Sequence, residues 1–240
     1  MEQKIYKFGD IAVRITYLYP YFARFAAGYE CDEAPEMELV MTEEDIENER
    51  ARSQDGANFP KEYLETLAVY RKFCTQALEK KVYLFHCSAV AVDGKAYLFT
   101  AASGTGKSTH VRLWRELLGD RAVMVNDDKP LLRLKEDGTV LVYGTPWNGK
   151  HRLSNNVCCP VQAICILNRG EENGIEKISA QDAFPRLLVQ TYRPDGREKW
   201  KEVIDGVVKI SHGVDLWSLH CNMELQAAEL SYNTMKGEGV

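Results

Sequence analysis

Long apolar runs are missing from this sequence of 240 residues. No stretch approaches the roughly 20 consecutive apolar residues that span a bilayer. The opening MEQKIYKFGD is too polar for a secretory signal peptide. The sequence also contains neither an internal repeat nor a low-complexity tract. We therefore expect a globular, cytoplasmic protein that does not bind a membrane.

An excess of charge of either sign is also lacking. The chain has 30 Lys and Arg residues against 35 Asp and Glu residues, a formal net charge of −5. That balance gives no electrostatic reason to expect nucleic acid as a partner. Apolar content of 45% and charged content of 27% are ordinary for a globular protein, and the length allows one large domain or a core with a smaller appendage.

Cysteine pairs at metal-binding spacing are absent. The seven cysteines include the adjacent Cys158 and Cys159, but none lies in a C-x₂-C arrangement, and their number is odd. This pattern indicates reduced thiols in a cytoplasmic protein and argues against a disulfide framework or a zinc site.

What the sequence does contain is a phosphate-binding loop, AASGTGKST, at residues 101–109. The apolar, β-prone run 95–100 precedes it, and apolar residues at helical spacing follow until Gly119 supplies a stop signal. Glycines in such a loop let backbone N–H groups converge on phosphate oxygens at a helix N-terminus. Lys107 can reach the β- and γ-phosphates, and the Ser108 hydroxyl can hold Mg²⁺. The predicted nucleotide-binding residues are Ser103, Gly104, Thr105, Gly106, Lys107, Ser108 and Thr109.

The first glycine of the pattern G-x-x-x-x-G-K-[ST] is missing, since Ala101 stands there. A small residue preserves close approach but narrows the conformations open to the loop. The competing interpretation, a Gly/Ser-rich turn that contains a lysine, does not account for the strand before the loop and the helix after it.

Two adjacent carboxylates follow the apolar strand at 122–125, in the run Asn126-Asp127-Asp128-Lys129-Pro130. A carboxylate at the end of a buried strand near a phosphate loop is where such enzymes hold the metal. Neighbours on one strand end point in different directions, so the second can accept the proton of an attacking hydroxyl. A surface turn fixed by Pro130 is the alternative interpretation of these residues.

These segments together resemble a known family. HCSAVAVDGKAYLFTAASGTGKSTH, followed by VNDDKPLL, resembles the kinase domain of HPr kinase/phosphorylase and is similar to the related phosphoenolpyruvate-carboxykinase-type P-loop fold. The later stretches YGTPWNGK and HCNMELQAAELSY look like an uncharacterised bacterial branch, whose relatives are associated with ribosomal-peptide maturation and peptide-serine phosphorylation. The resemblance covers about residues 81–230.

The resemblance implies ATP- and Mg²⁺-dependent phosphorylation of a hydroxyl, with Lys107 and Asp127 in catalysis and Ser108 and Asp128 on the metal. His86 matches the family histidine near the active centre. Ala101 departs from the family loop, and the HPr-binding region has no clear copy here, which makes HPr an unexpected substrate. Which aspartate is the base is assigned by analogy and can be exchanged.

The domain organisation follows from composition and turns. Residues 1–58 are predicted to form a small N-terminal α+β module that ends in the turn-rich run 53–58. Residues 59–240 are predicted to form the catalytic domain, beginning with a helix opened by Pro60 and a long strand over 82–92. Asp93-Gly94 and residues 136–138 mark hairpins beside the phosphate loop. Such hairpins favour a mixed α+β fold with a mixed sheet of the carboxykinase-like type over a doubly wound parallel sheet.

A second basic segment follows the strand at 140–143. The loop 144–152 is rich in Gly and Pro and ends in Lys150, His151 and Arg152. Lys150 or Arg152 can neutralise charge on a moving phosphoryl group, or the loop can be an exposed segment anchored by Trp147.

The predicted function is an ATP- and Mg²⁺-dependent kinase whose acceptor is a serine of a peptide or protein; other nucleoside triphosphates and a small-molecule hydroxyl stay open. The alternative from a different class is a nucleotide-binding regulatory module, which has little use for the second carboxylate. Assembly into a homo-oligomer stays open as well.

Overall fold

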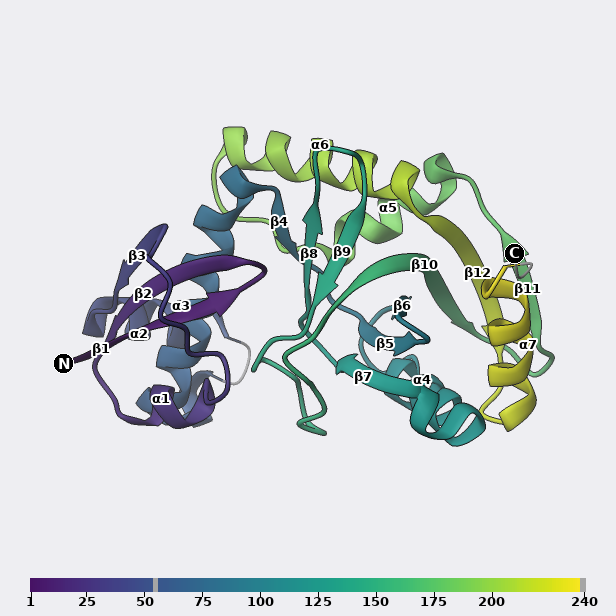
Figure 1. The fold of residues 1–240 in the computed structure, drawn as a ribbon, viewed down its shortest axis with the longest axis horizontal. Helices are drawn as coiled ribbons and strands as arrows, with labels where there is room; N and C mark the ends of the chain where they lie inside the picture. The colour runs from purple at the N-terminus through teal and green to yellow at the C-terminus, as the bar shows by residue number, and fades with distance from the viewer. Residues whose placement is uncertain (54–55, 238–240) are drawn as a thin grey trace. The chain divides into compact units, whose positions relative to one another are not determined.

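The computed structural model describes residues 1–53 and 56–237. Contacts between residues divide the chain into two compact units, Met1–Lys80 and Lys81–Val240, called here the N-terminal unit and the C-terminal unit. Each unit has its own sheet (Figure 1). No helix in the described part of the chain combines the length and the apolar character that a membrane span needs.

The N-terminal unit contains a three-stranded sheet in the order β1-β2-β3. A hairpin joins β1 to the antiparallel β2, while β3 runs parallel to β2. The unit is a small α+β module, as the sequence predicted. Its elements are β1 (Glu2–Phe8), β2 (Ile11–Tyr17), α1 (Tyr21–Phe25), β3 (Met37–Val40), α2 (Glu43–Arg52), η1 (Gly56–Asn58), α3 (Lys61–Ala77) and η2 (Leu78–Lys80).

The boundary between the units lies about one helix later than the sequence predicted. Helix α3 falls in the first unit because its apolar side completes that unit's core: the Phe73 ring lies 5.6 Å from the Phe8 ring, edge to face. The α3 carboxylate of Glu65 also accepts backbone N–H bonds from Leu18 (2.5 Å) and Tyr19 (3.1 Å). The turn-rich run near residue 58 is therefore a connection within the unit, and the division at Lys80–Lys81 replaces the predicted one at 58–59.

The C-terminal unit is built on a mixed sheet of nine strands among the described residues, in the order β4-β8-β9-β10-β6-β5-β7, with β12 beside β10 and β11 beside β12. Strand β10 runs parallel to its neighbours β6 and β12, and the other pairings are antiparallel. The predicted mixed sheet is thus confirmed. The strands are β4 (Val82–Leu84), β5 (Ser88–Val92), β6 (Lys95–Thr100), β7 (Ala122–Asn126), β8 (Leu131–Leu134), β9 (Val140–Tyr143), β10 (Cys158–Arg169), β11 (Gly174–Lys177) and β12 (Asp215–Cys221).

The single long strand predicted over 82–92 is wrong. Residues 85–87 interrupt it, so that β4 pairs with β8 while β5 pairs with β6 and β7. The interrupting backbone bonds to other segments instead: Phe85 N donates to Pro130 O, His86 N to Gln190 O, and Cys87 N to Asp128 O. The break brings His86 beside the aspartates.

Helices cover both faces of this sheet (Figure 1). Alternate residues of β5, β6 and β10 form one core with α4 and α7, because side chains along a strand point to opposite faces. Helices α5 and α6 pack together and cover the other side. The helical elements are α4 (Lys107–Leu118), η3 (Gly119–Arg121), α5 (Ala180–Gln190), α6 (Arg197–Gly213) and α7 (Leu225–Met235).

Two of these helices have distinctive features. Helix α5 contains Pro185 within its length. Glu224 is the N-cap of α7, and Asn222 accepts the Glu224 N–H in a turn before the helix. Met223 in that turn is 76% exposed.

Candidate functional site

The phosphate loop connects β6 to α4 at the point where the parallel strands end. Gly104 and Gly106 have φ values of 78° and 123°, which L side chains rarely adopt, so these two glycines are required by the backbone. Ala101 is not among the residues with positive φ. The glycine missing from the motif is therefore dispensable at this position, and Gly106 leads directly into the first turn of α4.

Lys107 is folded over the loop and is 8% exposed. Its ammonium donates to the carbonyl oxygens of Ala101 (3.1 Å) and Ala102 (3.5 Å). Burial lowers the pKa of Lys107 below its usual value, and the nearby Asp128 and Asp127 act in the opposite direction. The lysine thus shares a poorly hydrated space with both aspartates.

Asp127 lies at the end of β7 and is buried. The Ser88 hydroxyl, which belongs to β5 and is also buried, donates to Asp127 Oδ1 over 2.7 Å. Asn126 fixes the backbone here, because its Oδ1 accepts the N–H groups of Asp128 and Lys129, each at 2.8 Å. The carboxylate is therefore held in one orientation, as a proton acceptor must be.

Asp128 is the centre of a chain of polar contacts. Its Oδ1 lies 3.4 Å from His86 Nε2, and its Oδ2 lies 3.0 Å from the Lys129 ammonium. On the other side of the imidazole, His86 Nδ1 lies 2.7 Å from Gln190 Oε1 at the end of α5. Burial alone would raise the pKa of Asp128, but His86 and Lys129 overcome it and lower the pKa to about 2. Asp128 is therefore ionised at any physiological pH.

The loop after β9 closes against the same strand end. Asp127 N donates to Leu153 O (3.0 Å), and the Asn126 amide donates to Thr145 O (3.0 Å). Gly149 lies so near Asp128 that a Cβ there would sit 2.9 Å from the aspartate Cβ. Lys150 and Arg152 follow in this loop and are exposed. The structure thus brings the predicted basic segment beside Asp128, and the predicted anchor Trp147 is buried.

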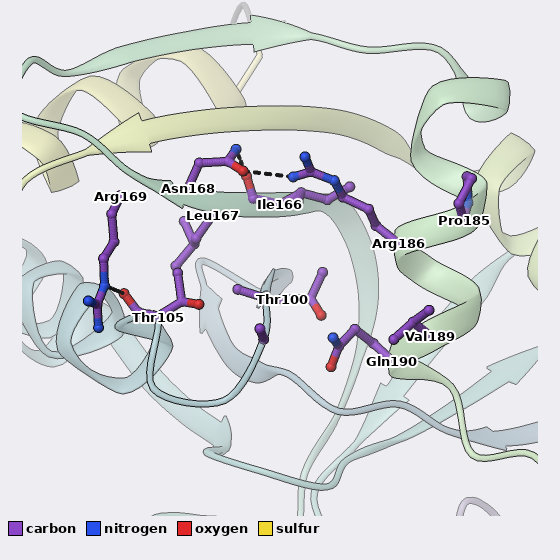
Figure 2. Close-up of a pocket in the computed structure, with 12 residues that line it drawn as sticks. Thr100, Thr105, Ile166, Leu167, Asn168, Arg169, Pro185, Arg186, Val189 and Gln190 are labelled. Atoms are coloured by element: carbon purple, nitrogen blue, oxygen red, sulfur yellow. Dashed lines mark hydrogen bonds between the residues drawn. The ribbon is translucent and has the colours of Figure 1, made fainter.

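Two cavities adjoin the phosphate loop. One, of about 510 Å³, lies along the first turns of α4 and is closed by the segments that follow β10 and β12; we call it the α4 cavity. The other, of about 580 Å³, lies between the loop, the end of β10 and helix α5; we call it the α5 cavity (Figure 2). Both share Thr105, Leu167, Asn168 and Arg169.

Several side chains of this region were missed by sequence reasoning. Arg169, at the end of β10, donates to the loop carbonyls of Gly104 and Thr105. Arg186 on α5 donates to Asn168 Oδ1 over 2.7 Å. Ser88 and Gln190 contact predicted residues from distant segments. None of these residues lies in a recognisable motif. Arg169 could be placed beside the loop only by knowing that β6 and β10 are parallel neighbours, because both strands then end at the same edge of the sheet.

Comparisons with known proteins add little to this geometry. No protein-family model matches the chain, and no curated protein does. Among solved structures, the Hpr(Ser) kinase/phosphatase from Coxiella burnetii is similar over 64% of this chain and 93% of its own, with 10% sequence identity and a TM-score of 0.36. That level of similarity identifies neither the family nor the activity. The functional assignment therefore depends on the side chains of the site.

The cysteines and possible metal ligands can be described briefly. All seven cysteines are free thiols. Within residues 1–53 and 56–237, no three His, Cys, Asp or Glu side chains are grouped closely enough to hold a metal ion by themselves.

Proposed function

We propose that this protein is an ATP- and Mg²⁺-dependent kinase that phosphorylates a hydroxyl, namely that of a serine in a peptide or protein. The observation that carries the proposal is the convergence of two strand ends. The loop after β6 supplies Lys107, and the end of β7 supplies Asp127 and Asp128, whose charges act on that lysine. A protein that only binds a nucleotide has no use for a second, buried carboxylate held by Ser88.

The nucleotide fits the loop and the α4 cavity. Strands β6, β10 and β12 are parallel, so the segments after them meet at one edge, where ligands bind in open α/β sheets. Phosphates at the N-terminus of α4 would meet the backbone N–H groups of the loop and the Lys107 ammonium. The nucleoside would then extend along Thr109 into the α4 cavity.

The residues present suit Mg²⁺ held together with phosphates. This ion usually takes one or two protein oxygens and completes its shell with phosphate oxygens and water. Ser108, in the first turn of α4, and Asp128, after β7, are the oxygen donors we assign to it. Bound there, Mg²⁺ would neutralise phosphate charge.

The chemical step assigns one role to each side chain. Asp127 accepts the proton of the acceptor hydroxyl as that oxygen bonds to the γ-phosphorus. The bond between the γ-phosphorus and the bridging oxygen breaks, and its electron pair leaves with ADP. Lys107 stabilises the negative charge on the transferring phosphoryl group. Lys150 and Arg152 follow Gly149, which lies against Asp128, so their side chains can approach the same phosphoryl group.

The test is ADP release from ATP and Mg²⁺ in the presence of Ser-containing peptides, with phosphate on the peptide measured by mass. We expect Lys107→Ala and Asp127→Asn to lower turnover by about 100-fold or more, since each removes a group that acts in the transition state. The exposed Lys209→Ala and Asp120→Asn are matched controls and should keep full activity. Tight ATP binding without phosphoryl transfer to any hydroxyl would instead support the regulatory module.

A further inference from the structure

We infer that the α5 cavity holds the phosphoryl acceptor, and that Arg186 binds a carboxylate which this acceptor carries close to its hydroxyl. The inference rests on the proposed function and names the substrate class for it: a hydroxyl compound bearing an acidic group.

The position of the α5 cavity suits an acceptor. Its floor includes Thr100, Ala101 and Ala102, where β6 passes into the phosphate loop. Gln190 lies on its α5 side (Figure 2). This amide contacts His86, which in turn contacts Asp128. A molecule in this cavity therefore adjoins the phosphate loop and is connected to Asp128 through the side chains of Gln190 and His86. The volume of about 580 Å³ is that of a small-ligand pocket, so it admits one side chain with its neighbours.

The charge of the α5 cavity favours an anion. Among the described residues that line it, two are arginines and none is Asp or Glu. Arg169 donates to carbonyl oxygens of the loop, so it is committed to loop structure. Arg186 is exposed, and the contact it makes with Asn168 is with a neutral amide oxygen. A guanidinium has five N–H donors in a fork that matches a carboxylate.

Asn168 orients this guanidinium. Its Nδ2 donates to Ser218 Oγ on β12 (3.2 Å), while its Oδ1 accepts from Arg186 Nη1 (2.7 Å). The amide therefore has a fixed direction, and the arginine is directed over the cavity (Figure 2). Arg186 and Gln190 are four residues apart on α5, a spacing that places them on one face with their Cβ atoms about 5–6 Å apart.

The remaining wall of the α5 cavity is apolar and partly open. Val189, which lines it, is 62% exposed, and Pro185 and Ile166 contribute further apolar surface. A nucleoside is the other molecule that could fill such a space. It is better accommodated in the α4 cavity, which follows the first turns of the helix that receives the phosphates.

The experiment compares short peptides that carry Ser next to Asp, on either side, with isosteric peptides that carry Asn. Glycerate and glycerol form the small-molecule pair, which separates a peptide from a small hydroxy acid as the source of the carboxylate. For each compound we would measure phosphorylation kinetics and, independently of turnover, the dissociation constant. We expect the native protein to favour the acidic member of at least one pair by roughly tenfold, a difference typical of a charge-assisted arginine contact.

The variant Arg186→Gln should remove that preference by raising KM and the dissociation constant of the acidic compound. Arg186→Lys should keep part of it. The dissociation constant of ATP should stay unchanged in both, and Arg115→Gln, an exposed arginine on α4, should behave as the native protein.

Equal affinity of the native protein for acidic and neutral members would overturn the inference. So would a loss of ATP affinity in Arg186→Gln, which would make Arg186 a nucleotide ligand. If the acidic compounds bind through Arg186 but receive no phosphate, the proposed kinase activity fails while the anion site stands.

Discussion

His110 shows how one buried side chain can be assigned a protonation state from its neighbours. It lies in the first turns of α4, where its Nε2 is 3.0 Å from Ser231 Oγ. The Ser231 hydroxyl donates its single proton to Ala228 O and accepts from Trp114 Nε1. His110 Nε2 must then be the donor of the contact with Ser231, so Nδ1 is a buried acceptor. Burial lowers the pKa of His110 to about 4, so the ring is neutral near pH 7.

This residue should make folding stability depend on pH in a window that the carboxylates do not explain. In the unfolded chain His110 takes up a proton near pH 6.5, whereas in the folded protein it does so near pH 4. The free energy of unfolding is therefore unaffected by His110 above pH 6.5. It falls as the pH is lowered toward 4, by on the order of 3 kcal/mol, because the unfolded chain then binds a proton that the folded protein does not.

Urea unfolding of the native protein and of His110→Gln, followed between pH 7 and pH 4, measures this loss. Gln keeps a donor for Ser231 but does not titrate, so its unfolding free energy should fall less steeply. The exposed His220→Gln on β12 is the control and should follow the native curve. Identical slopes for the native protein and His110→Gln would contradict the assignment.

At the scale of elements, the contact of α6 with the sheet depends on one glycine. Gly206 lies in the middle of α6, against the ring and hydroxyl of Tyr83 on β4. Tyr83 is buried, and burial together with Glu202 and Asp205 of α6 raises its pKa to about 12. A methyl group at position 206 would overlap with the aromatic ring, and the ring is held by the core around it.

We therefore expect Gly206→Ala to destabilise the protein by about 1–3 kcal/mol, although alanine favours the helical state, because overpacking outweighs propensity here. Thermal unfolding followed by circular dichroism tests this. Gly174→Ala at the start of β11 is the matched control, since nothing lies within 4 Å of the added methyl group. A melting temperature for Gly206→Ala equal to that of the control would show that α6 can move away from the sheet at no cost.

The elements nearest the motif were those that the sequence predicted best. Strand β6, the loop and α4 up to Gly119 follow from the local hydrophobic pattern and from the glycines that end each element. The break at residues 85–87 could not be foreseen, because the run contains no Gly or Pro and long-range backbone bonds to Pro130 and Gln190 decide it. Helix α6 was not predicted, although Val203, Val207 and Ile210 recur at helical spacing and are buried.

At the scale of the whole molecule, the candidate site depends on contacts that no motif encodes. The resemblance to a known family predicted that Lys107, Asp127 and Asp128 share one site, and the fold places them near one another. Three contacts around these residues join distant segments: Ser88 with Asp127, 39 residues apart, Gln190 with His86, 104 apart, and Arg169 with Thr105, 64 apart. The pairing of β6 with β5 and β10 brings Ser88 and Arg169 to this part of the sheet. Sequence patterns predict elements, but pairing order decides which elements share an edge.

The division of the molecule leads to a last prediction, which rests on the proposed function. Every contact described for the loop, the aspartates and both cavities lies within the C-terminal unit, Lys81–Val240. That unit also contains the core that supports α4. A fragment of residues 81–240 should therefore fold and bind Mg²⁺-ADP with an affinity within about threefold of the full chain, since a unit with its own core can fold alone.

Calorimetric titration of the fragment and the full chain measures this affinity, after a cooperative thermal transition has shown that the fragment is folded. The Lys107→Ala variant of each should lose binding, which ties the signal to the loop. If the folded fragment bound the nucleotide more than tenfold more weakly, the nucleotide site would need residues 1–80. Equal affinity would place phosphate binding wholly in the C-terminal unit, because a unit that folds alone with unchanged affinity contains every residue that the nucleotide contacts.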